Sequence, residues 1–209
     1  MKVLIVCILL TGCAYHSVVR LGSIPLEAVH VIDVFETVTI NGEETQILRS
    51  KGVGFSIKDG YILATTHAVF HEGLHKPTFF IDELEIEFIG WKRDVALFKH
   101  PEPKGYFTLG DVAPVGTETV LIGNSMLRGV NIKTGMVSML GVGGYEIPEK
   151  CFTHTTPMVK GDSGSPILAR RGNGYEVIGM ANAGILAAQG YNFGICVSYI
   201  KEAIKEILE

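Results

Sequence analysis

The sequence predicts an all-β protein built from two β-rich halves, with one helix at the C-terminal end. Glycine accounts for 25 of the 209 residues and is spread along the chain, as expected where tight turns join many short strands. Short apolar or alternating runs recur at close spacing between turn dipeptides, which is the pattern of antiparallel strands. Only the last dozen residues carry the apolar period of a helix.

The first half contains clear hairpin signals. Two extended runs meet at Asn41-Gly42, a dipeptide favoured in two-residue hairpin turns. Asp59-Gly60 marks a second turn between apolar runs, and residues 84–88 alternate apolar with acidic side chains, as a half-buried strand does. These turns predict that neighbouring strands in the sequence pair with each other.

A stretch rich in proline and glycine, residues 101–116, separates the two halves. We therefore expect a first barrel over about 25–108 and a second over about 114–198. The final helix is expected at about 199–208. Its predicted apolar face consists of Ile200, Ala203, Ile204 and Ile207.

Composition and charge narrow the class of protein. Apolar residues make up 47% of the chain and charged residues 19%, which is typical of a globular protein. The formal net charge is −4, and the sequence has neither a run of Lys and Arg nor a basic stretch interleaved with aromatics. A nucleic acid is therefore not expected as a partner.

The first thirteen residues form a pattern of their own. Lys2 is followed by an apolar run from Val3 to Leu10, which is too short to span a bilayer but suits a secretory signal. The run leads into Leu10-Thr11-Gly12-Cys13, which resembles the lipobox of bacterial lipoproteins. That resemblance implies a signal peptide over 1–12, acylation of Cys13, and an exported protein anchored on the periplasmic or cell-surface side of a membrane. The alternative is a buried first strand with a chance cysteine.

Two cysteines follow the signal, Cys151 and Cys196. Disulfides persist in exported proteins, so a bridge between them is one expectation. Two buried free thiols are the other, and the sequence does not choose between them.

Three short motifs, in the order His, Asp, Ser, suit nucleophilic catalysis. A serine hydroxyl needs a base to accept its proton, and imidazole suits neutral pH. The imidazole needs an acceptor to fix its tautomer, and the developing oxyanion needs backbone N–H donors. His67 after an apolar strand, Asp94 before one, and Ser163 in "KGDSGSP" supply the three side chains, and the N–H groups of Gly161 and Ser163 supply the donors.

The motifs together resemble the trypsin/chymotrypsin-fold serine proteases, and most closely their bacterial HtrA/Deg-type branch. The resemblance covers about residues 50–200. It rests on "GVGFSIKDGYILATTHAV", "RDVALFK", "GTETVLIGNS" with "KTGMVSML", "GDSGSPIL" and "EVIGMANAGILAAQGYNFGI". It implies two packed antiparallel six-stranded β-barrels, with His67 and Asp94 from the first, Ser163 from the second, and the active site between them. The implied activity is that of a serine endopeptidase, which needs no cofactor and acts on polypeptides.

The chain departs from that branch in two respects. No PDZ domain follows the barrels, so residues 13–209 are expected to be a protease domain alone. Asp162 precedes the serine where Deg-type proteases usually have asparagine. In trypsin-like zymogens that aspartate pairs with a new amino terminus, which an acylated Cys13 cannot provide. The partner of Asp162 is left open.

Substrate recognition is implied by the resemblance. Residues of the primary pocket are uncharged, which predicts cleavage after small to medium apolar side chains. The strand that would bind the substrate backbone by β-augmentation lies beside them. The implied substrate-binding residues are Pro157, Met158, Ala181, Gly194 and Cys196 in or near the pocket, and Asn182, Ala183 and Gly184 on the strand.

Two other functions compete with this interpretation. "HEGLH", residues 71–75, matches a zinc motif that needs a continuous helix and a third ligand. Gly73 weakens a helix there and Pro77 ends it, so a surface stripe of His67, His71 and His75 is a better interpretation than a zinc protease. The second alternative is a catalytically idle protease fold that serves as a binding module. The oligomeric state is not predicted.

Overall fold

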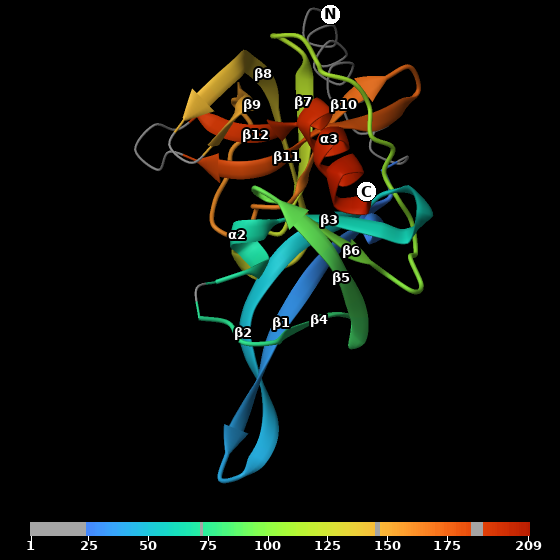
Figure 1. Cartoon of the computed structure of the whole chain (residues 1–209). Helices are drawn as coiled ribbons and strands as arrows, with labels where there is room; N and C mark the ends of the chain where they lie inside the picture. The colour runs from blue at the N-terminus through green and yellow to red at the C-terminus, as the bar shows by residue number, and fades with distance from the viewer. Residues whose placement is uncertain (1–23, 72, 145–146, 185–189) are drawn as a thin grey trace, which may run out of the picture.

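The computed structural model describes residues 24–71, 73–144, 147–184 and 190–209. Two closed six-stranded antiparallel β-barrels make up most of the fold, followed by a short C-terminal helix (Figure 1). This confirms the predicted all-β class and the double-barrel architecture.

The first barrel has the strand order β1-β2-β3-β6-β5-β4, and β4 closes it by pairing with β1. One-turn helices precede β1 (η1, Leu26–Ala28), precede β3 (η2, Lys58–Gly60) and follow β3 (α2, Thr66–Val69). Its strands are β1 (Val29–Ile40), β2 (Glu43–Ser56), β3 (Tyr61–Thr65), β4 (Pro77–Ile81), β5 (Leu84–Lys92) and β6 (Val95–Lys99).

The second barrel has the corresponding order β10-β11-β12-β9-β8-β7. Its strands are β7 (Glu118–Gly123), β8 (Asn131–Gly144), β9 (Ile147–His154), β10 (Pro166–Arg171), β11 (Gly174–Gly184) and β12 (Asn192–Cys196), and a one-turn helix, η3 (Ser125–Leu127), lies between β7 and β8. Residues 100–117 connect the barrels.

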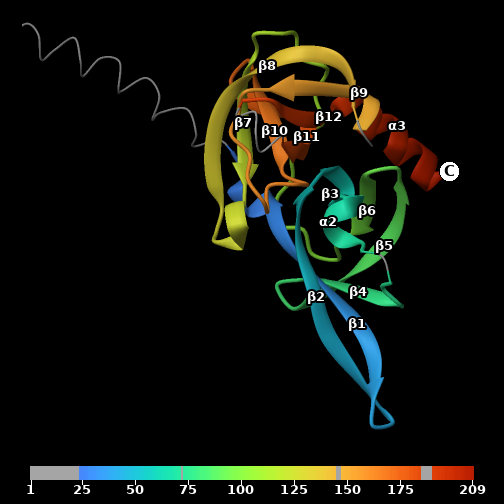
Figure 2. The same cartoon turned by 90° about the vertical axis from the view of Figure 1, so that its left-hand side faces the viewer.

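The β1–β2 hairpin turns at Asn41-Gly42, as predicted. Both residues have positive φ, 54° and 88°, which is the conformation that a two-residue hairpin turn requires. Beyond the barrel the two strands pair only with each other, from Thr37 to Ile40 and from Glu43 to Gln46. Figures 1 and 2 show this hairpin extending well away from the rest of the molecule.

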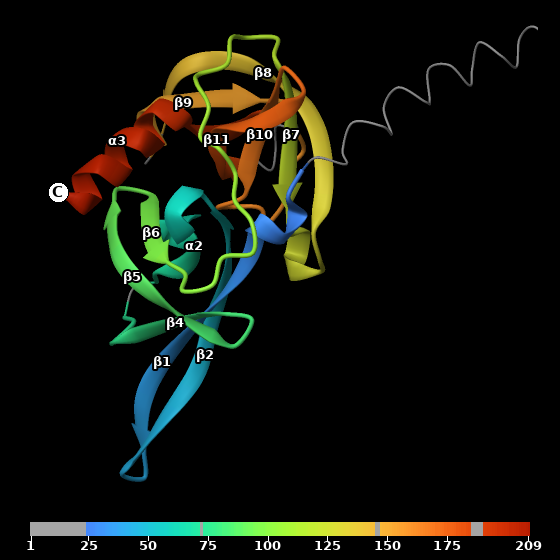
Figure 3. The same ribbon diagram turned by 90° about the vertical axis from the view of Figure 1, so that its right-hand side faces the viewer.

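The C-terminal helix, α3 (Val197–Leu208), connects the two barrels. It begins two residues earlier than expected, with Cys196 at the N-cap position. Its predicted apolar face is inward: Ile200 and Ala203 are fully buried, and Ile204 and Ile207 pack against the same core. The helix contacts β5 and β6 of the first barrel and β11 and β12 of the second (Figure 3). Burial of Ile200 alone contributes about 2 kcal/mol to this packing.

The largest core cluster joins the barrels. It contains Val53 and Leu97 from the first barrel and Ile122 and Met180 from the second, all of them buried. Because this shared core fixes one barrel against the other, loops from both can meet at a single site.

Cys151 and Cys196 are free thiols, so the disulfide, one of the two expectations, is not formed. The strand register explains why. Cys151 on β9 pairs with Ile195 on β12, so the next residue, Cys196, points to the opposite face of the sheet. Burial raises the pKa of Cys151 to about 12 and that of Cys196 to about 11, which keeps both thiols protonated and unreactive.

Candidate active site

His67 lies in the single turn of α2, directly after β3. The apolar residues of β3 bury that strand in the first barrel, so the residues that follow emerge at its end. The His67 side chain is 48% exposed, which leaves the imidazole open to a ligand.

Asp94 is placed by the tight turn between β5 and β6. Arg93 takes a left-handed conformation with φ +49°, and Val95 then pairs with Thr65, the last residue of β3. This register brings Asp94 beside α2. Its carboxylate accepts hydrogen bonds from the backbone N–H of His67 at 3.0 Å and from Nδ1 of the imidazole, at 2.9 Å to Oδ1 and 2.8 Å to Oδ2. Asp94 therefore fixes both the ring orientation and the tautomer of His67.

Ser163 lies in the loop before β10, and this loop needs glycine on both sides of Asp162-Ser163. Gly161 has φ +96° and Gly164 has φ +87°, which side chains of L-residues rarely adopt. A Cβ atom at Gly164 would lie 2.0 Å from the carbonyl oxygen of Val53 on β2. The loop of the second barrel is thus pressed directly against the first barrel.

Ser163 and His67 face one cavity but are not hydrogen-bonded to each other. Among the described residues, the Ser163 hydroxyl has one acceptor, the backbone carbonyl of Asn182 at 3.0 Å. Hydrogen bonds between catalytic groups are often formed only when substrate is bound, so this arrangement is compatible with either an active or an idle site.

Asn182 contributes more than the sequence indicated. We expected only its backbone to bind substrate, yet its side-chain Nδ2 donates to Asp94 Oδ2 at 2.5 Å. Asn182 lies where the pairing of β11 with β12 shifts by one residue. This β-bulge turns the amide toward the first barrel. The bulge arises from pairing between strands, so no local sequence signal predicts it.

The backbone N–H of Gly161 is oriented by a neighbouring segment. The carbonyl of Lys160 accepts a hydrogen bond from the N–H of Met126 at 2.8 Å. The peptide bond is planar and trans, so the Gly161 N–H points to the side opposite that carbonyl. It therefore points away from Met126.

The cavity at His67 and Ser163 has a volume of about 520 Å³. Its lining comes from β2, α2, the segment after β7 and the serine loop, with none from β11. Among the residues that the structure describes, three cations and no carboxylate line it. The lining residues are Arg49, Ser50, Lys51, Gly52, Val53, His67, Ala68, His71, Met126, Leu127, Lys160, Gly161 and Ser163.

None of the expected substrate-binding residues lines this cavity; they lie in β11, in β12 and in the segment after β9. Ala181 pairs with Gly194, and Ala183 and Gly184 pair with the start of β12. Ala181 and Cys196 are buried in the second-barrel core, against which Met158 packs, whereas Pro157 is exposed.

Asp162 has a partner that the sequence did not identify. Its carboxylate is fully buried, and Lys133 Nζ lies 2.5 Å from Oδ2. Ser125 Oγ donates to Oδ1 at 3.0 Å and the Val159 N–H donates to Oδ2 at 2.7 Å.

The "HEGLH" segment lacks the helix that a zinc motif needs. α2 ends at Val69, and Gly73 and Lys76 have φ of +86° and +49°. His71 and His75 therefore do not share a helical face, and Glu72 lies outside the described residues. Among the residues that the structure describes, no group of three or more His, Cys, Asp or Glu side chains could hold a metal ion.

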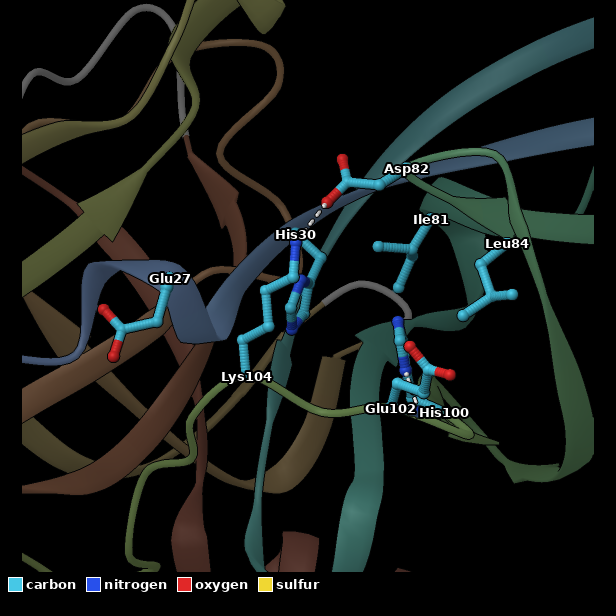
Figure 4. Close-up of a pocket in the computed structure, with 8 residues that line it drawn as sticks. All are labelled: Glu27, His30, Ile81, Asp82, Leu84, His100, Glu102 and Lys104. Atoms are coloured by element: carbon cyan, nitrogen blue, oxygen red, sulfur yellow. Dashed lines mark hydrogen bonds and ion pairs between the residues drawn. The ribbon is translucent and has the colours of Figure 1, made fainter.

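A second cavity, of about 250 Å³, lies on the first barrel and is lined by none of these catalytic candidates. Its lining residues, shown in Figure 4, are Glu27, His30, Ile81, Asp82, Leu84, His100, Glu102 and Lys104. The His30 and His100 rings stack with centroids 5.9 Å apart, and His30 Nε2 lies 2.7 Å from Ser56 Oγ. Burial lowers the pKa of His30 to about 4, so its imidazole is neutral at pH 7.

The paired six-stranded barrels, with a histidine and a serine at the cavity between them and an aspartate hydrogen-bonded to the histidine, define the chymotrypsin-like class of fold. Within that class, the chain is homologous to the DegP/HtrA serine proteases.

The curated relatives include periplasmic serine endoprotease DegP. The protein from Salmonella typhimurium is 28% identical over 178 residues, which cover 80% of this chain and 37% of the relative. That from Escherichia coli K12 is 28% identical over 165 residues, covering 75% and 34%. The chain thus spans about a third of the length of these relatives. No family model matches the chain.

Solved structures of proteases share the fold. The serine endoprotease from Yersinia pestis superposes with a TM-score of 0.65 at 17% identity, covering 85% of this chain and 62% of that one. HtrA-type protease AlgW with a tripeptide gives 0.69 at 21% identity, covering 88% and 61%. Within the described residues, no helix combines the length and the apolar character needed to cross a membrane.

Proposed function

We propose that this protein is a serine endopeptidase that cleaves polypeptides through an acyl-enzyme intermediate. The main support for this function is the hydrogen bond from His67 Nδ1 to Asp94, which orients the imidazole toward the cavity that Ser163 also lines. Homology to serine endoproteases supports the same activity.

In the proposed reaction, Ser163 Oγ attacks the scissile carbonyl carbon while its proton passes to Nε2 of His67. The N–H groups of Gly161 and Ser163 stabilise the oxyanion, and Asp94 stabilises the imidazolium. His67 then gives the proton to the leaving amine as the C–N bond breaks. Water, deprotonated by the same imidazole, hydrolyses the ester and restores the serine.

For this reaction the Ser163 hydroxyl must turn from the Asn182 carbonyl toward His67. Rotation about χ1 moves only the one oxygen atom, and substrate that pairs with β11 would compete for the strand on which Asn182 lies. We expect the Ser163–His67 hydrogen bond to form in the substrate complex.

The two sides of the cleavage site are expected to differ in preference. The uncharged side chains around Met158 and Ala181 favour a small to medium apolar residue before the scissile bond. We expect the substrate residues after the scissile bond, on the leaving side, to face the cavity that carries Arg49, Lys51 and Lys160. Glu36 and Asp33 partly neutralise Arg49 and Lys51, at 2.6 and 2.7 Å, whereas Lys160 has no such partner among the described residues. An acidic residue shortly after the scissile bond would complement this side.

The test is proteolysis of unfolded casein by the full chain, beside Ser163→Ala and with or without EDTA. We expect activity that EDTA does not affect and that Ser163→Ala abolishes. Activity that survives in Ser163→Ala, or that EDTA removes, would contradict the proposal. Peptide mapping of the products then gives the preference on both sides.

The present hydrogen bond of Ser163 to Asn182 also suits a catalytically idle binding module. Labelling with a fluorophosphonate separates the two functions, because only an activated serine reacts. We expect the wild type to be labelled and Ser163→Ala not to be. A folded wild type that is neither labelled nor active would favour the binding module.

We further propose that the protein is exported and anchored to a membrane by lipid on Cys13. Cys13 lies outside the described residues, and the proposal rests on the Leu10-Thr11-Gly12-Cys13 pattern and on the periplasmic location in the name of the DegP relatives. Cells fed an alkyne palmitate analogue should label the protein. Cys13→Ser should lose the label while Cys7→Ser, in the signal, keeps it; equal labelling of the two variants would contradict lipidation at Cys13.

A further inference from the structure

Asp162 stands between the two residues assigned to the oxyanion hole, and its carboxylate points into the second barrel. Its side chain is 0% exposed, whereas the Lys133 side chain is 18% exposed. A buried carboxylate without a counter-charge is strongly disfavoured, so the ammonium of Lys133 at 2.5 Å is what permits Asp162 to lie here.

Hydrogen bonds of Asp162 hold the backbone of the catalytic loop on both sides of this residue. Oδ2 accepts from the Val159 N–H at 2.7 Å, and the Asp162 N–H donates to the Val159 carbonyl at 3.1 Å. The Asp162 carbonyl in turn accepts from the Ser165 N–H at 3.0 Å. Backbone on both sides of Gly161 and Ser163 is thus held to one residue.

The same carboxylate also holds the segment that orients the Gly161 peptide. Ser125 Oγ donates to Oδ1 at 3.0 Å, and the next residue, Met126, donates its N–H to the Lys160 carbonyl at 2.8 Å. Gly123 allows this close packing: a Cβ atom there would lie 2.3 Å from Oδ1. A shift of Asp162 would therefore disturb both the loop and the segment packed against it.

Lys133 reaches this point from β8, where it pairs with Leu121 on β7. Both strands belong to the closed second barrel, so the ammonium is held by a rigid element rather than by a loop. The cation that balances Asp162 is consequently part of the folded barrel.

We propose that Lys133 is a positioning residue for catalysis: by balancing Asp162 it holds the N–H groups of Gly161 and Ser163 toward the substrate carbonyl. This inference rests on the proposed endopeptidase function. It implies that the catalytic loop is ordered by a lysine of its own barrel, so that no new amino terminus need be released to neutralise Asp162.

Removal of each partner should have a different effect. Lys133→Met leaves a buried carboxylate without a counter-charge, so the loop must rearrange to bring it to water. Asp162→Asn leaves a lysine that can extend into solvent, since Lys133 is already partly exposed. The double variant Lys133→Met/Asp162→Asn has neither charge, and asparagine can still hydrogen-bond to Val159 and Ser125.

The decisive experiment measures kcat and KM on one peptide for these three variants of the full chain. We expect Lys133→Met to lower kcat about 100-fold, the effect of losing an oxyanion donor, with KM changed less than about threefold. The double variant should recover at least about tenfold of that loss. A Lys133→Met enzyme with kcat within threefold of wild type, or a double variant no better than Lys133→Met, would overturn the proposal.

A matched control is the exposed ion pair of Lys201 on α3 with Asp111, at 3.4 Å. Lys201→Met, Asp111→Asn and their combination should leave kcat unchanged. Equal losses of kcat in Lys201→Met and Lys133→Met would show a general effect of removing lysine and would contradict the positioning role.

Thermal unfolding of the same variants keeps this inference separate from the proposed function. Lys133→Met should lower the midpoint, and Asp162→Asn in that background should raise it again, whether or not the protein is active. If the wild type has no activity, the proposed function fails, but the unfolding midpoints of the single and double variants still test whether Lys133 and Asp162 interact. Strictly additive changes in the midpoint would show that Lys133 and Asp162 are not coupled.

Discussion

Asn182 donates a hydrogen bond from Nδ2 to Oδ2 of Asp94 at 2.5 Å, across the boundary between the two barrels. Asp94 is the carboxylate that orients His67, and Asn182 is also the residue whose carbonyl accepts from Ser163. One residue of the second barrel therefore contacts both the aspartate and the serine of the proposed triad.

Asn182→Ala should lower kcat/KM about tenfold, because Asp94 loses a donor that holds its carboxylate in place. Asn182→Asp, of the same shape, should cause a larger loss, since it places a second carboxylate against Asp94. Steady-state kinetics on one peptide measures both. An Asn182→Asp enzyme as active as wild type would show that this contact has no role.

Asp94→Asn should reduce kcat about 10⁴-fold, because an amide in that position favours the wrong tautomer of His67. The fold should be kept, since the exchange hardly changes the size of the side chain. Circular dichroism checks the fold and a peptide assay the rate. A loss of less than about tenfold would mean that Asp94 does not orient the base.

Gly164→Ala should destabilise the protein by about 3 kcal/mol or more, since the new Cβ would lie 2.0 Å from the Val53 carbonyl and φ is +87°. The matched control is Gly172→Ala, which has φ +55° but no atom within 4 Å of the new Cβ, so its cost should be about 1 kcal/mol. Urea unfolding of both variants measures the difference. Equal losses would show that the contact between the barrels does not constrain Gly164.

Two buried histidines should make the protein less stable in mild acid. Burial lowers the pKa of His30 and of His154 from 6.5 to about 4, so the unfolded chain takes up protons that the folded one does not. Stability is complete above pH 6.5 and falls as the pH drops toward 4, by roughly 3 kcal/mol for each histidine over that range. Urea unfolding at pH 5.0, 6.0 and 7.0 measures the slope.

His154→Gln should reduce this slope, because neither nitrogen of His154 has a hydrogen-bond partner among the described residues and glutamine does not titrate. His71→Gln, at an exposed position, is the control and should leave the slope as it is. If His154→Gln and His71→Gln lose stability equally as the pH falls, His154 is not responsible for the loss of stability in mild acid.

Peptides with glutamate two residues after the scissile bond should be cleaved faster than those with lysine there, by about three- to tenfold. The reason is the charge of Arg49, Lys51 and Lys160 on that side of the cavity. Lys160→Glu should reverse the preference, and added salt should weaken it. No difference between the peptides would contradict a leaving-side role for these cations.

Local patterns were sufficient for much of the fold. Asn41-Gly42 forms the predicted turn because few other residues tolerate two positive φ angles in succession. The apolar spacing of Ile200 and Ala203 predicted the buried face of α3. These features depend on residues close together in the chain.

Contacts between distant residues were not predictable in this way. The register of β9 against β12 separates the thiols of Cys151 and Cys196, and a bulge in β11 turns Asn182 toward Asp94. Such features depend on how strands pair, which no short segment specifies.

The strand-and-turn pattern, the C-terminal helix, and the His67, Asp94 and Ser163 motifs could be recognised in the sequence alone. Turn chemistry and apolar periodicity are local properties, so they can be recognised without a structure. The pairing of Lys133 with Asp162, in contrast, is visible only in the folded protein. Residues 29 apart in the chain meet there because barrel closure brings β8 behind the serine loop, and a buried carboxylate requires a counter-charge at that point.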